Sequence, residues 1–446
     1  MSLIASSKRL IIGAGPTGQS VARHFQELGI HFEIADTRQS SALKEEFNAQ
    51  FPGVATYFGP LKTDYLDRFE EIVVSPGVPP TTDGLDQTSA HLISDIQIFR
   101  RAWPENQPLI AITGSNAKST VTSLVAKIIK ADGRHVLVGG NLGPQALDLL
   151  AKRTDESVAV LELSSFQLER TRRLKATVAT CLNMSPDHLD WHGSMIAYHQ
   201  AKHRIFEGVG AIVVNSNDPL SQPLVPDQTP TIKFALQHPD FRQFGVMVVD
   251  GDEWISLGAD PWMAVSDLPM SGRYMIQNAM AAFGICHLIG VDKAIAVAAT
   301  REYAGLPHRM DERVPVNGVR FINDSKGTNV GASATAVSSI ETDGHLYLLA
   351  GGESKDADLT AWVKTVRVHC HHIFAFGRDR QRFVDVLGDQ ATAVETLEKA
   401  FALAVQQAVA GDVVLLSPAC ASFDQFQNYQ ARGDYFETLV EAHREV

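Results

Sequence analysis

One octapeptide of the chain carries the residue types that bind nucleotide phosphates. It reads Thr113-Gly114-Ser115-Asn116-Ala117-Lys118-Ser119-Thr120 and lies between an apolar, strand-like segment and a helix-like one. In such a loop the backbone N–H groups surround phosphate oxygens, the lysine reaches the terminal phosphate and the next hydroxyl ligates Mg²⁺. Ala117 stands where the general pattern has glycine, and its Cβ restricts the loop backbone. The pattern predicts an ATP site, with a plain strand-to-helix turn as the alternative.

A second glycine-rich turn, Gly13-Ala14-Gly15-Pro16-Thr17-Gly18, also follows a strand-like segment and opens a helix-like one. Asp36 closes the next strand-like segment, close to the spacing of a dinucleotide-binding unit. A helix N-terminus of this kind favours a diphosphate, but it does not identify the nucleotide. By itself the turn leaves three alternatives: an NAD site, a site for another nucleotide, or a tight turn in a packed sheet.

Alternating strand-like and helix-like segments must position these loops, and they predict α/β units with parallel sheets. We expect three domains, at residues 1–98, 99–305 and 306–446. A polar, proline-containing stretch near Asn106 is suited to a linker at the first boundary. In the second domain, the alternating segment 244–257 turns at Asp250-Gly251, which predicts a β-hairpin.

The composition excludes several classes of protein. The 446 residues are 45% hydrophobic and 20% charged, with a formal net charge of −12, which argues against a nucleic-acid partner. The four cysteines form no CxxC pair, which fits a reducing compartment. The sequence shows no signal-peptide pattern and no apolar run of membrane-spanning length. We therefore expect a cytoplasmic protein without membrane insertion.

Nine segments of the chain stand in the order in which they occur in the Mur ligase family. They are TGSNAKST (113–120), GGNLG (139–143), LELSSFQLE (161–169), NMSPDHLDWH (183–192), AKHRIF (201–206), LPHRM (306–310), NDSKGTN (323–329), GGESKDAD (351–358) and SPACASFDQFQNYQARG (417–433). The chain thus resembles this family along nearly its whole length. The resemblance implies an α/β fold of three domains: a Rossmann-like N-terminal domain, a P-loop ATPase central domain and a Rossmann-like C-terminal domain.

The resemblance implies an ATP-dependent ligase that adds an amino acid to a UDP-linked peptidoglycan precursor through an acyl phosphate. Its cofactor would be Mg²⁺, in two sites. The segment Asp36-Thr37-Arg38 favours the member that joins UDP-N-acetylmuramoyl-L-alanine to D-glutamate, acting as a monomer on these small molecules. The alternatives are another Mur ligase, a folylpolyglutamate synthase, an NAD-dependent oxidoreductase and a nucleotide-binding regulator without catalysis.

The resemblance also implies roles for individual residues. The catalytic residues would be Lys118, Asn141, His188 and Lys202. The Mg²⁺ ligands would be Ser119, Glu162, His188 and Lys202. The ATP contacts would be Gly114, Ser115, Asn116, Ala117, Lys118, Ser119, Thr120, Asn278, Arg309 and Asp324. The UDP-precursor contacts would be Thr17, Asp36, Thr37, Arg38, Gly77, Asn141 and His188. The amino-acid pocket would comprise Thr328, Lys355, Ser422 and Tyr429.

Lys202 has the most unusual of these expected roles. In the family the matching lysine is carbamylated by CO₂ and becomes an anionic Mg²⁺ ligand, which requires a neutral amine. Burial and nearby cations produce one, whereas the basic run Lys202-His203-Arg204 by itself favours a solvated lysine. The chain departs from the family at Tyr274-Met275, where His-Asn is usual. Tyr429 is a second departure, because the family is expected to have phenylalanine at this position.

Overall fold

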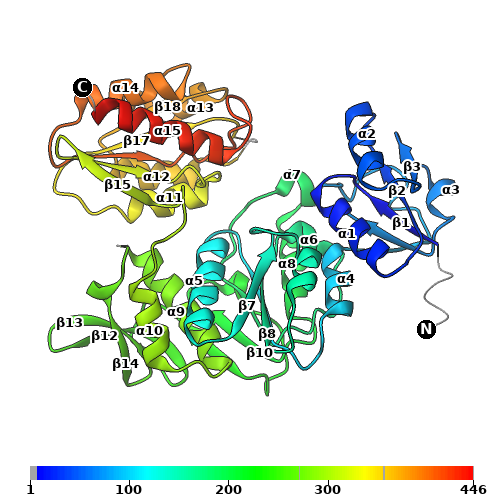
Figure 1. Cartoon of the computed structure of the whole chain (residues 1–446). Coiled ribbons are helices and arrows are strands. Elements are labelled where there is room, and N and C mark those ends of the chain that lie inside the picture. Colours follow the sequence, from blue (N-terminus) through cyan, green and yellow to red (C-terminus); the bar gives the residue numbers. More distant parts are fainter. Residues whose placement is uncertain (1–7, 271, 355–356, 445–446) are drawn as a thin grey trace. The chain divides into compact units, whose positions relative to one another are not determined.

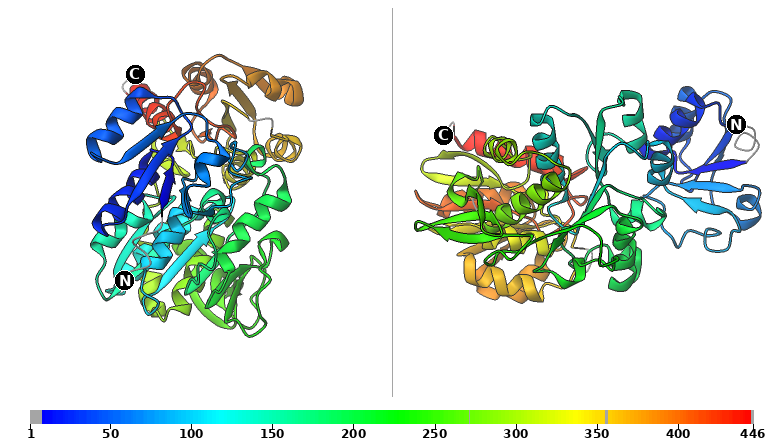
Figure 2. Two further views of the ribbon diagram at one scale, coloured as in Figure 1. Left: turned by 90° about the vertical axis from the view of Figure 1, so that its right-hand side faces the viewer. Right: turned by 90° about the horizontal axis from the view of Figure 1, so that it is seen from below.

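The computed structural model describes residues 8–270, 272–354 and 357–444. The strands form three separate sheets, which Figures 1 and 2 show in blue, in cyan to green, and in yellow to red. By its internal contacts the chain divides into two compact units. Met1–Asp267 and Gln277–Glu302 form the first unit, which holds the first two sheets. Leu268–Ile276 and Tyr303–Val446 form the second unit, which holds the third sheet.

The N-terminal sheet is parallel throughout, with the strand order β3-β2-β1-β4-β5. Its strands are β1 (Arg9–Ile12), β2 (Phe32–Asp36), β3 (Ala55–Phe58), β4 (Glu71–Val74) and β5 (His91–Ile93). Its helices are α1 (Pro16–Glu27), α2 (Ser41–Gln50), α3 (Thr63–Leu66) and α4 (Asp95–Ala102). The strand order reverses between β1 and β4, so a ligand crevice is expected at their carboxyl ends. The Rossmann-like expectation for this domain is confirmed.

The segment that we expected to be a linker after α4 is anchored. Trp103 is 2% exposed, stacks on Phe99 of α4 and donates its Nε1–H to the carbonyl of Gln107 at 3.1 Å. Gln107 in turn donates to the carbonyl of Thr154 at 2.7 Å. The polar, proline-containing composition did not indicate this packing, in part because Gln107 and Thr154 are 47 residues apart. A boundary at residue 98 also falls inside α4.

The central sheet has the strand order β14-β13-β12-β11-β10-β9-β6-β8-β7. Its strands are β6 (Leu109–Thr113), β7 (His135–Gly140), β8 (Ser157–Glu162), β9 (Val178–Cys181), β10 (Ala211–Asn215), β11 (Thr231–Phe234), β12 (Gln243–Val249), β13 (Asp252–Leu257) and β14 (Asp260–Ala264). The helices and 3-10 helix used below are α5 (Lys118–Ala131), η1 (Ala146–Lys152), α6 (Ser165–Glu169), α7 (Leu189–His192), α8 (Met195–His203) and α9 (Arg273–Leu288). β12 and β13 form the expected antiparallel hairpin. β14, which we did not predict, extends it.

The third sheet has the order β15-β16-β20-β17-β18-β19, and only β15 runs antiparallel to its neighbour. Its strands are β15 (Asp311–Val316), β16 (Val319–Asn323), β17 (Leu346–Gly351), β18 (His372–Phe376), β19 (Ala391–Ala393) and β20 (Val413–Leu416). Its helices are α11 (Val330–Ser338), α12 (Thr360–His369), α13 (Arg380–Leu387), α14 (Leu397–Gln407) and α15 (Tyr429–Arg444). In the described part of the chain, no helix has the length and apolar character needed to cross a bilayer.

Candidate active site

The phosphate-type loop lies at the carboxyl end of β6, the strand between β8 and β9. Asn183 holds the loop from both sides: its Oδ1 accepts from the N–H of Asn116 at 2.8 Å and its Nδ2 donates to the Asn116 carbonyl at 3.2 Å. The hydroxyls of Tyr198 and Ser115 lie 2.9 Å apart. The loop is thus fixed by residues from beyond β9 and from α8, which the motif alone did not reveal.

Ala117 occupies the left-handed region of backbone space, with φ of 66°, immediately before α5. That conformation costs a residue with a Cβ roughly 1–2 kcal/mol, which is why glycine is usual there. The chain therefore keeps the loop geometry despite the substitution. Lys118 folds back over the loop and donates to the carbonyls of Gly114 and Ser115 at 2.9 and 2.8 Å.

Glu162, at the end of β8, joins two of the expected site residues. Its Oε2 accepts from Ser119 Oγ at 2.5 Å, and its Oε1 accepts from Asn141 Nδ2 at 2.6 Å. The N–H of Asn141 also donates to the Glu162 carbonyl at 2.8 Å. Gly140 permits this approach, because a Cβ there would lie 2.4 Å from the Glu162 carbonyl oxygen. The buried carboxylate of Glu162 and hydroxyl of Ser119 therefore meet the amide of the exposed Asn141 beside the loop.

Lys202 is buried rather than solvated, with 2% of its surface exposed. Its Nζ donates to the Gly114 carbonyl at 2.7 Å and to Thr113 Oγ1 at 3.4 Å, and it lies 4.9 Å from the centre of the Tyr198 ring. Burial, followed by the charge of Lys118, lowers the pKa of Lys202 to about 7. The basic run around it therefore misleads about its environment, and the neutral amine that a carbamate requires is available.

His188 precedes α7 in a left-handed conformation, with φ of 54°. Its ring packs edge-on against Phe166 of α6 at 4.7 Å, and its Nε2 lies 3.5 Å from the carboxylate of Asp187. Among the described residues, no three His, Cys, Asp or Glu side chains form a metal cage. The oxygen donors of Ser119 and Glu162 nevertheless suit Mg²⁺, which commonly takes few protein ligands together with waters and substrate phosphates.

In the N-terminal domain, the side chain of Asp36 fixes the backbone of the glycine-rich turn by hydrogen bonding. Its carboxylate accepts from the N–H of Ala14 at 2.8 Å and from the backbone and guanidinium of Arg38 at 2.7–2.9 Å. Although burial opposes it, these hydrogen bonds leave the pKa of Asp36 below its ordinary value. The contacts use the four acceptor positions of a carboxylate. Asp36 was expected to contact the UDP-linked precursor, and in this structure its carboxylate accepts from Ala14 and Arg38.

The same turn depends on its glycines for close packing. A Cβ on Gly13 would meet Ser75 Oγ at 2.6 Å, and one on Gly18 would meet the Gly13 carbonyl at 1.8 Å. Thr17 Oγ1 donates to Oε1 of Gln145, before η1, at 2.9 Å. The turn Ser75–Gly77 follows β4, the neighbour of β1, so Gly77 and Thr17 lie at the carboxyl ends of adjacent strands. Thr37 follows β2 and is exposed.

In the second unit, Asp324 is a buried carboxyl group at the end of β16. It accepts from Ser417 Oγ at 2.7 Å and from the N–H of Met310 at 3.3 Å, and burial raises its pKa to about 7. Lys326 places its ammonium 4.0 Å from the centre of the Tyr429 ring. A tyrosine at position 429 therefore supplies a cation–π partner to this loop.

The remaining residues of the expected amino-acid pocket are only partly accounted for. Ser422 is 3% exposed in the loop after β20, and Thr328 lies in the loop before α11. Lys355 lies outside the described residues. Of the expected ATP contacts, Asn278 belongs to the first unit, whereas Arg309 and Asp324 belong to the second.

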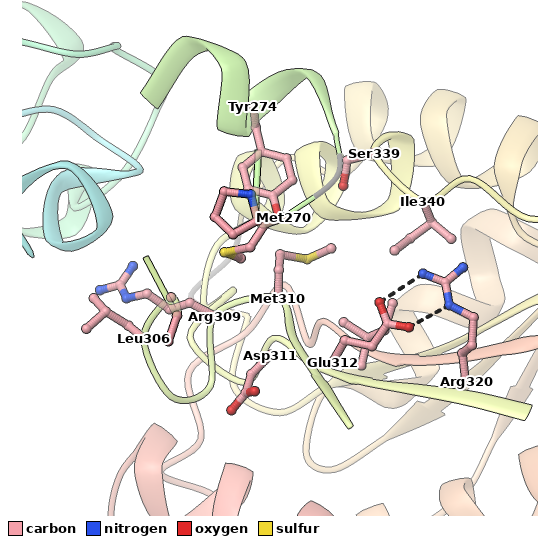
Figure 3. Close-up of a pocket in the computed structure, with 14 residues that line it drawn as sticks. Met270, Tyr274, Leu306, Arg309, Met310, Asp311, Glu312, Arg320, Ser339 and Ile340 are labelled. Atoms are coloured by element: carbon pink, nitrogen blue, oxygen red, sulfur yellow. Dashed lines mark hydrogen bonds and ion pairs between the residues drawn. The ribbon is translucent and has the colours of Figure 1, made fainter. Parts of the chain in front are cut away.

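A pocket of about 280 Å³ lies within the second unit, beside β15 (Figure 3). Met270, Met310 and the ring of Tyr274 form an apolar wall of the pocket. On one side, Arg320 and Glu312 form a bidentate ion pair with distances of 2.7 and 2.9 Å. Arg309 also lines the pocket, although Figure 3 shows its guanidinium on the side away from this ion pair. Tyr274, one of the two departures from the family pattern, is therefore a wall of this pocket.

Models of known protein families match all three parts of the chain. They are the N-terminal domain of MurD-like Mur ligases at residues 7–96, the Mur ligase middle domain at 112–286 and the glutamate ligase domain of Mur ligases at 308–420. A UDP-N-acetylmuramoylalanine–D-glutamate ligase of Pseudomonas savastanoi pv. phaseolicola is 42% identical over 99% of both chains. The protein of the same name from Chromohalobacter salexigens is 43% identical over 98% of this chain and 97% of that one. The chain belongs to the Mur ligase family.

Solved structures support the same fold for this Mur ligase. A pseudomurein peptide ligase type C from Methanothermus fervidus aligns with a TM-score of 0.63 at 17% identity, over 98% of this chain and 100% of that one. The MurF ligase of Thermotoga maritima, solved with ADP, aligns with a TM-score of 0.62 at 14% identity, over 100% and 99% of the two chains. At such identities the likeness concerns the three-domain fold alone.

The motifs identified the loop 113–120, Asn141 and Glu162 but missed the residues that fix the positions of these groups. Asn183 was visible only as the first letter of a longer motif, and Tyr198 lies outside every motif. Gln145 also lies just beyond the end of GGNLG. The signal for Asn183 was its residue type alone, because asparagine side chains often hydrogen-bond to backbone groups in turns. Nothing local to Tyr198 or Gln145 indicates a partner that is distant in sequence.

Proposed function

We propose that this Mur ligase joins D-glutamate to UDP-N-acetylmuramoyl-L-alanine and converts ATP to ADP and phosphate. The main support is the 42% identity, over 99% of both chains, to a ligase named for these two substrates. The buried Ser119–Glu162 hydrogen bond and the ammonium of Lys118 folded over the loop support the ATP-dependent part of the proposal. The proposal also includes a monomer located in the cytoplasm. The cytoplasm is the compartment that supplies both ATP and a UDP-linked substrate.

An amide bond does not form directly from a carboxylate, because the oxygen that must leave is a poor leaving group. In the proposed reaction the precursor carboxylate attacks the γ-phosphorus of ATP, and the bond to the β-phosphate oxygen breaks to release ADP. The amine of D-glutamate then attacks the acyl carbon, loses a proton, and phosphate leaves through a tetrahedral intermediate. Positioning the reactants and neutralising the developing charge are the tasks that fall to the protein.

The residues of the central domain divide these tasks. The N–H groups of Gly114–Thr120 would bind the ATP phosphates, and Lys118 would exchange its two carbonyl partners for phosphate oxygens. Asn141 would donate to the reacting acyl or phosphoryl oxygen. Ser119 and Glu162 would hold one Mg²⁺, and His188 with carbamylated Lys202 would hold a second. When bound, these ions neutralise phosphate charge and lower the barrier to attack.

Carbamylation of Lys202 follows from its environment in this proposal. With a pKa of about 7, a large fraction of the amine is neutral at physiological pH. The neutral nitrogen forms a bond to the carbon of CO₂ and releases one proton, which converts a neutral amine into an anion. The nearby charge of Lys118, which disfavours a second ammonium, favours an anionic carbamate.

The two other substrates would be held by the flanking domains. The N-terminal domain would hold the UDP end through Thr17, Thr37, Arg38 and Gly77, with Asp36 fastening the loop. In the C-terminal domain, Thr328, Lys355, Ser422 and Tyr429 would hold D-glutamate, whose two carboxylates require a cation and several hydroxyl donors. Arg309, Asp324 and Asn278 would contact ATP.

A panel of amino acids with ADP release as the measurement tests the proposal. ADP should appear only when UDP-N-acetylmuramoyl-L-alanine and D-glutamate are both present, and L-glutamate should be inactive. Equal turnover with L-alanine or meso-diaminopimelate would refute the substrate assignment and leave the ligase class intact. Bound NAD, seen by its absorbance in the purified protein, would instead support the oxidoreductase alternative.

A further inference from the structure

One face of α1 is fastened to η1 by a row of polar contacts. Thr17, Ser20 and Arg23 are three residues apart, so they share a face of the helix. Thr17 Oγ1 donates to Gln145 Oε1 at 2.9 Å, and Ser20 Oγ donates to Asp148 Oδ1 at 2.8 Å. The Arg23 guanidinium donates to both oxygens of Asp148 at 2.9 Å. These five residues form what we call the α1–η1 clamp.

Both ends of the clamp lead directly to parts of the proposed active site. Thr17 belongs to the glycine-rich turn that follows β1, next to the carboxyl end of β4. On the other side, Gln145 lies four residues after Asn141, whose backbone and side chain both donate to Glu162. One short segment of chain, from Asn141 to Asp148, therefore connects the Glu162 cluster to the first turns of α1.

The clamp is not needed merely to hold α1 in place. Val21 and Phe25 of α1 belong to one contiguous buried cluster with Phe99 of α4 and Leu147 of η1. That apolar contact already supplies a large non-directional attraction. The Arg23 and Asp148 side chains are 44% and 33% exposed, so their ion pair adds little to stability. Hydrogen bonds are directional, however, and they fix the register between two packed surfaces.

We propose that Gln145 and Asp148 are positioning residues for the UDP-linked substrate. By fixing the first turn of α1 relative to Asn141, they set where the reacting carboxylate lies when the nucleotide end is held in the N-terminal crevice. In this proposal both residues act through α1 and assist no bond-making step themselves. This inference rests on the proposed function, because it assigns the N-terminal turn to the precursor.

Two variants, each of which weakens a different contact of the clamp, test the proposal. Asp148→Asn keeps the shape of the side chain but removes its charge, and Gln145→Leu removes the acceptor of Thr17. Each should raise KM for UDP-N-acetylmuramoyl-L-alanine about fivefold, the effect expected for losing one partly exposed polar contact. KM for ATP and Tm should remain those of the wild type. Asp155→Asn is the matched control, since this exposed carboxylate follows η1 and lies 3.8 Å from Arg153 rather than near α1.

A double variant in which the two charged residues are exchanged distinguishes a positioning role from a general structural role. Arg23→Asp combined with Asp148→Arg should recover most of the precursor affinity that either change alone removes. A uniform loss, in which Tm, KM for ATP and KM for the precursor all change and the exchange restores nothing, would overturn the inference. Calorimetric titration keeps the two proposals apart. Wild-type protein that does not bind the precursor contradicts the proposed function, whereas equal binding by wild type and both single variants contradicts only the clamp.

Discussion

Ser119 Oγ donates to Glu162 Oε2 at 2.5 Å, which joins the first turn of α5 to the end of β8. Both side chains are buried, and the other carboxylate oxygen already accepts from Asn141. These two contacts therefore fix the orientation of the Glu162 carboxyl group next to the phosphate loop. Replacing Glu162 by a neutral residue of the same shape isolates the effect of the carboxylate charge.

Glu162→Gln should lower kcat by about 100-fold or more, because one preorganised charge at a reacting centre commonly contributes that much. The Mg²⁺ concentration that gives half-maximal activity should also rise. ADP release measured across a Mg²⁺ series checks both expectations. Glu156→Gln, an exposed change immediately before the same strand, is the control. An unchanged Mg²⁺ dependence would show that Glu162 is not a metal ligand.

Lys118→Ala should remove nearly all activity, by roughly 10³-fold in kcat/KM for ATP, because the phosphate charge loses its mobile counter-charge. Lys130→Ala, on the exposed surface near the end of the same helix, should have no effect. Steady-state kinetics with ATP as the varied substrate makes the comparison. Near-normal turnover of Lys118→Ala at saturating ATP would show that the octapeptide is not the catalytic loop.

Ala117→Gly should stabilise the protein slightly while preserving activity. The left-handed conformation at this position costs alanine roughly 1–2 kcal/mol, and glycine removes that strain. Part of the resulting stabilisation is lost again, because glycine has more conformational freedom in the unfolded chain. A net increase of about 0.5–1 kcal/mol is expected, seen as a small rise in Tm. Ala117→Val should have the opposite effect, because a branched side chain tolerates this conformation least. A lower Tm for the glycine variant would contradict the strain.

The parts of this molecule that the sequence predicted well are those whose signals are local. The strand Leu109–Thr113 is apolar, and the loop motif and the helix α5 follow it in the predicted order. β14 was missed because Pro261 argues against a strand; the proline is tolerated because β14 is an edge strand. The burial of Lys202 was invisible to composition, because Thr113 and Gly114, to which its ammonium donates, are 89 and 88 residues away along the chain. The role expected for Asp36 stays a prediction, and its carboxylate accepts from Ala14 and Arg38 in the structure.

Asp95 provides a pH-dependent test of the junction after β5. It is 1% exposed at the first residue of α4, and neither oxygen has a hydrogen bond of ordinary geometry. Burial raises its pKa to about 6, opposed by weaker contacts with the backbone of the first turn and with Gln167. Because the folded state holds the proton more tightly than the unfolded state, stability should fall as pH rises from about 4 to 6.

Asp95→Asn should therefore raise Tm at pH 7.5, by an amount corresponding to about 1–3 kcal/mol. The advantage over the wild type should shrink as pH falls and disappear near pH 4, where the wild-type carboxyl group is protonated. Thermal unfolding at pH 4, 5.5 and 7.5 checks the trend. Asp86→Asn, an exposed change in the same domain, should show no such trend. A constant difference at all three pH values would mean that the charge of Asp95 is not responsible.

The sign of the charge at Lys202 can be determined by chemical rescue. Lys202→Ala removes a buried amine that donates to Gly114 and Thr113, and we expect turnover to fall by at least about 100-fold. If the working form is a carbamate, the missing group is an anionic oxygen ligand. Acetate or formate should then restore part of the activity by entering the vacated space, whereas methylamine should not.

Wild-type activity should also rise with CO₂ and with pH near 7. The neutral fraction of Lys202 increases as pH passes through its pKa of about 7, and only that fraction reacts with CO₂. Lys202→Arg is the matched variant, because it keeps a cation that cannot form the carbamate and should be as inactive as alanine. If arginine sustains turnover, or if only amines rescue the alanine variant, the group acts as a cation and the carbamate proposal is wrong.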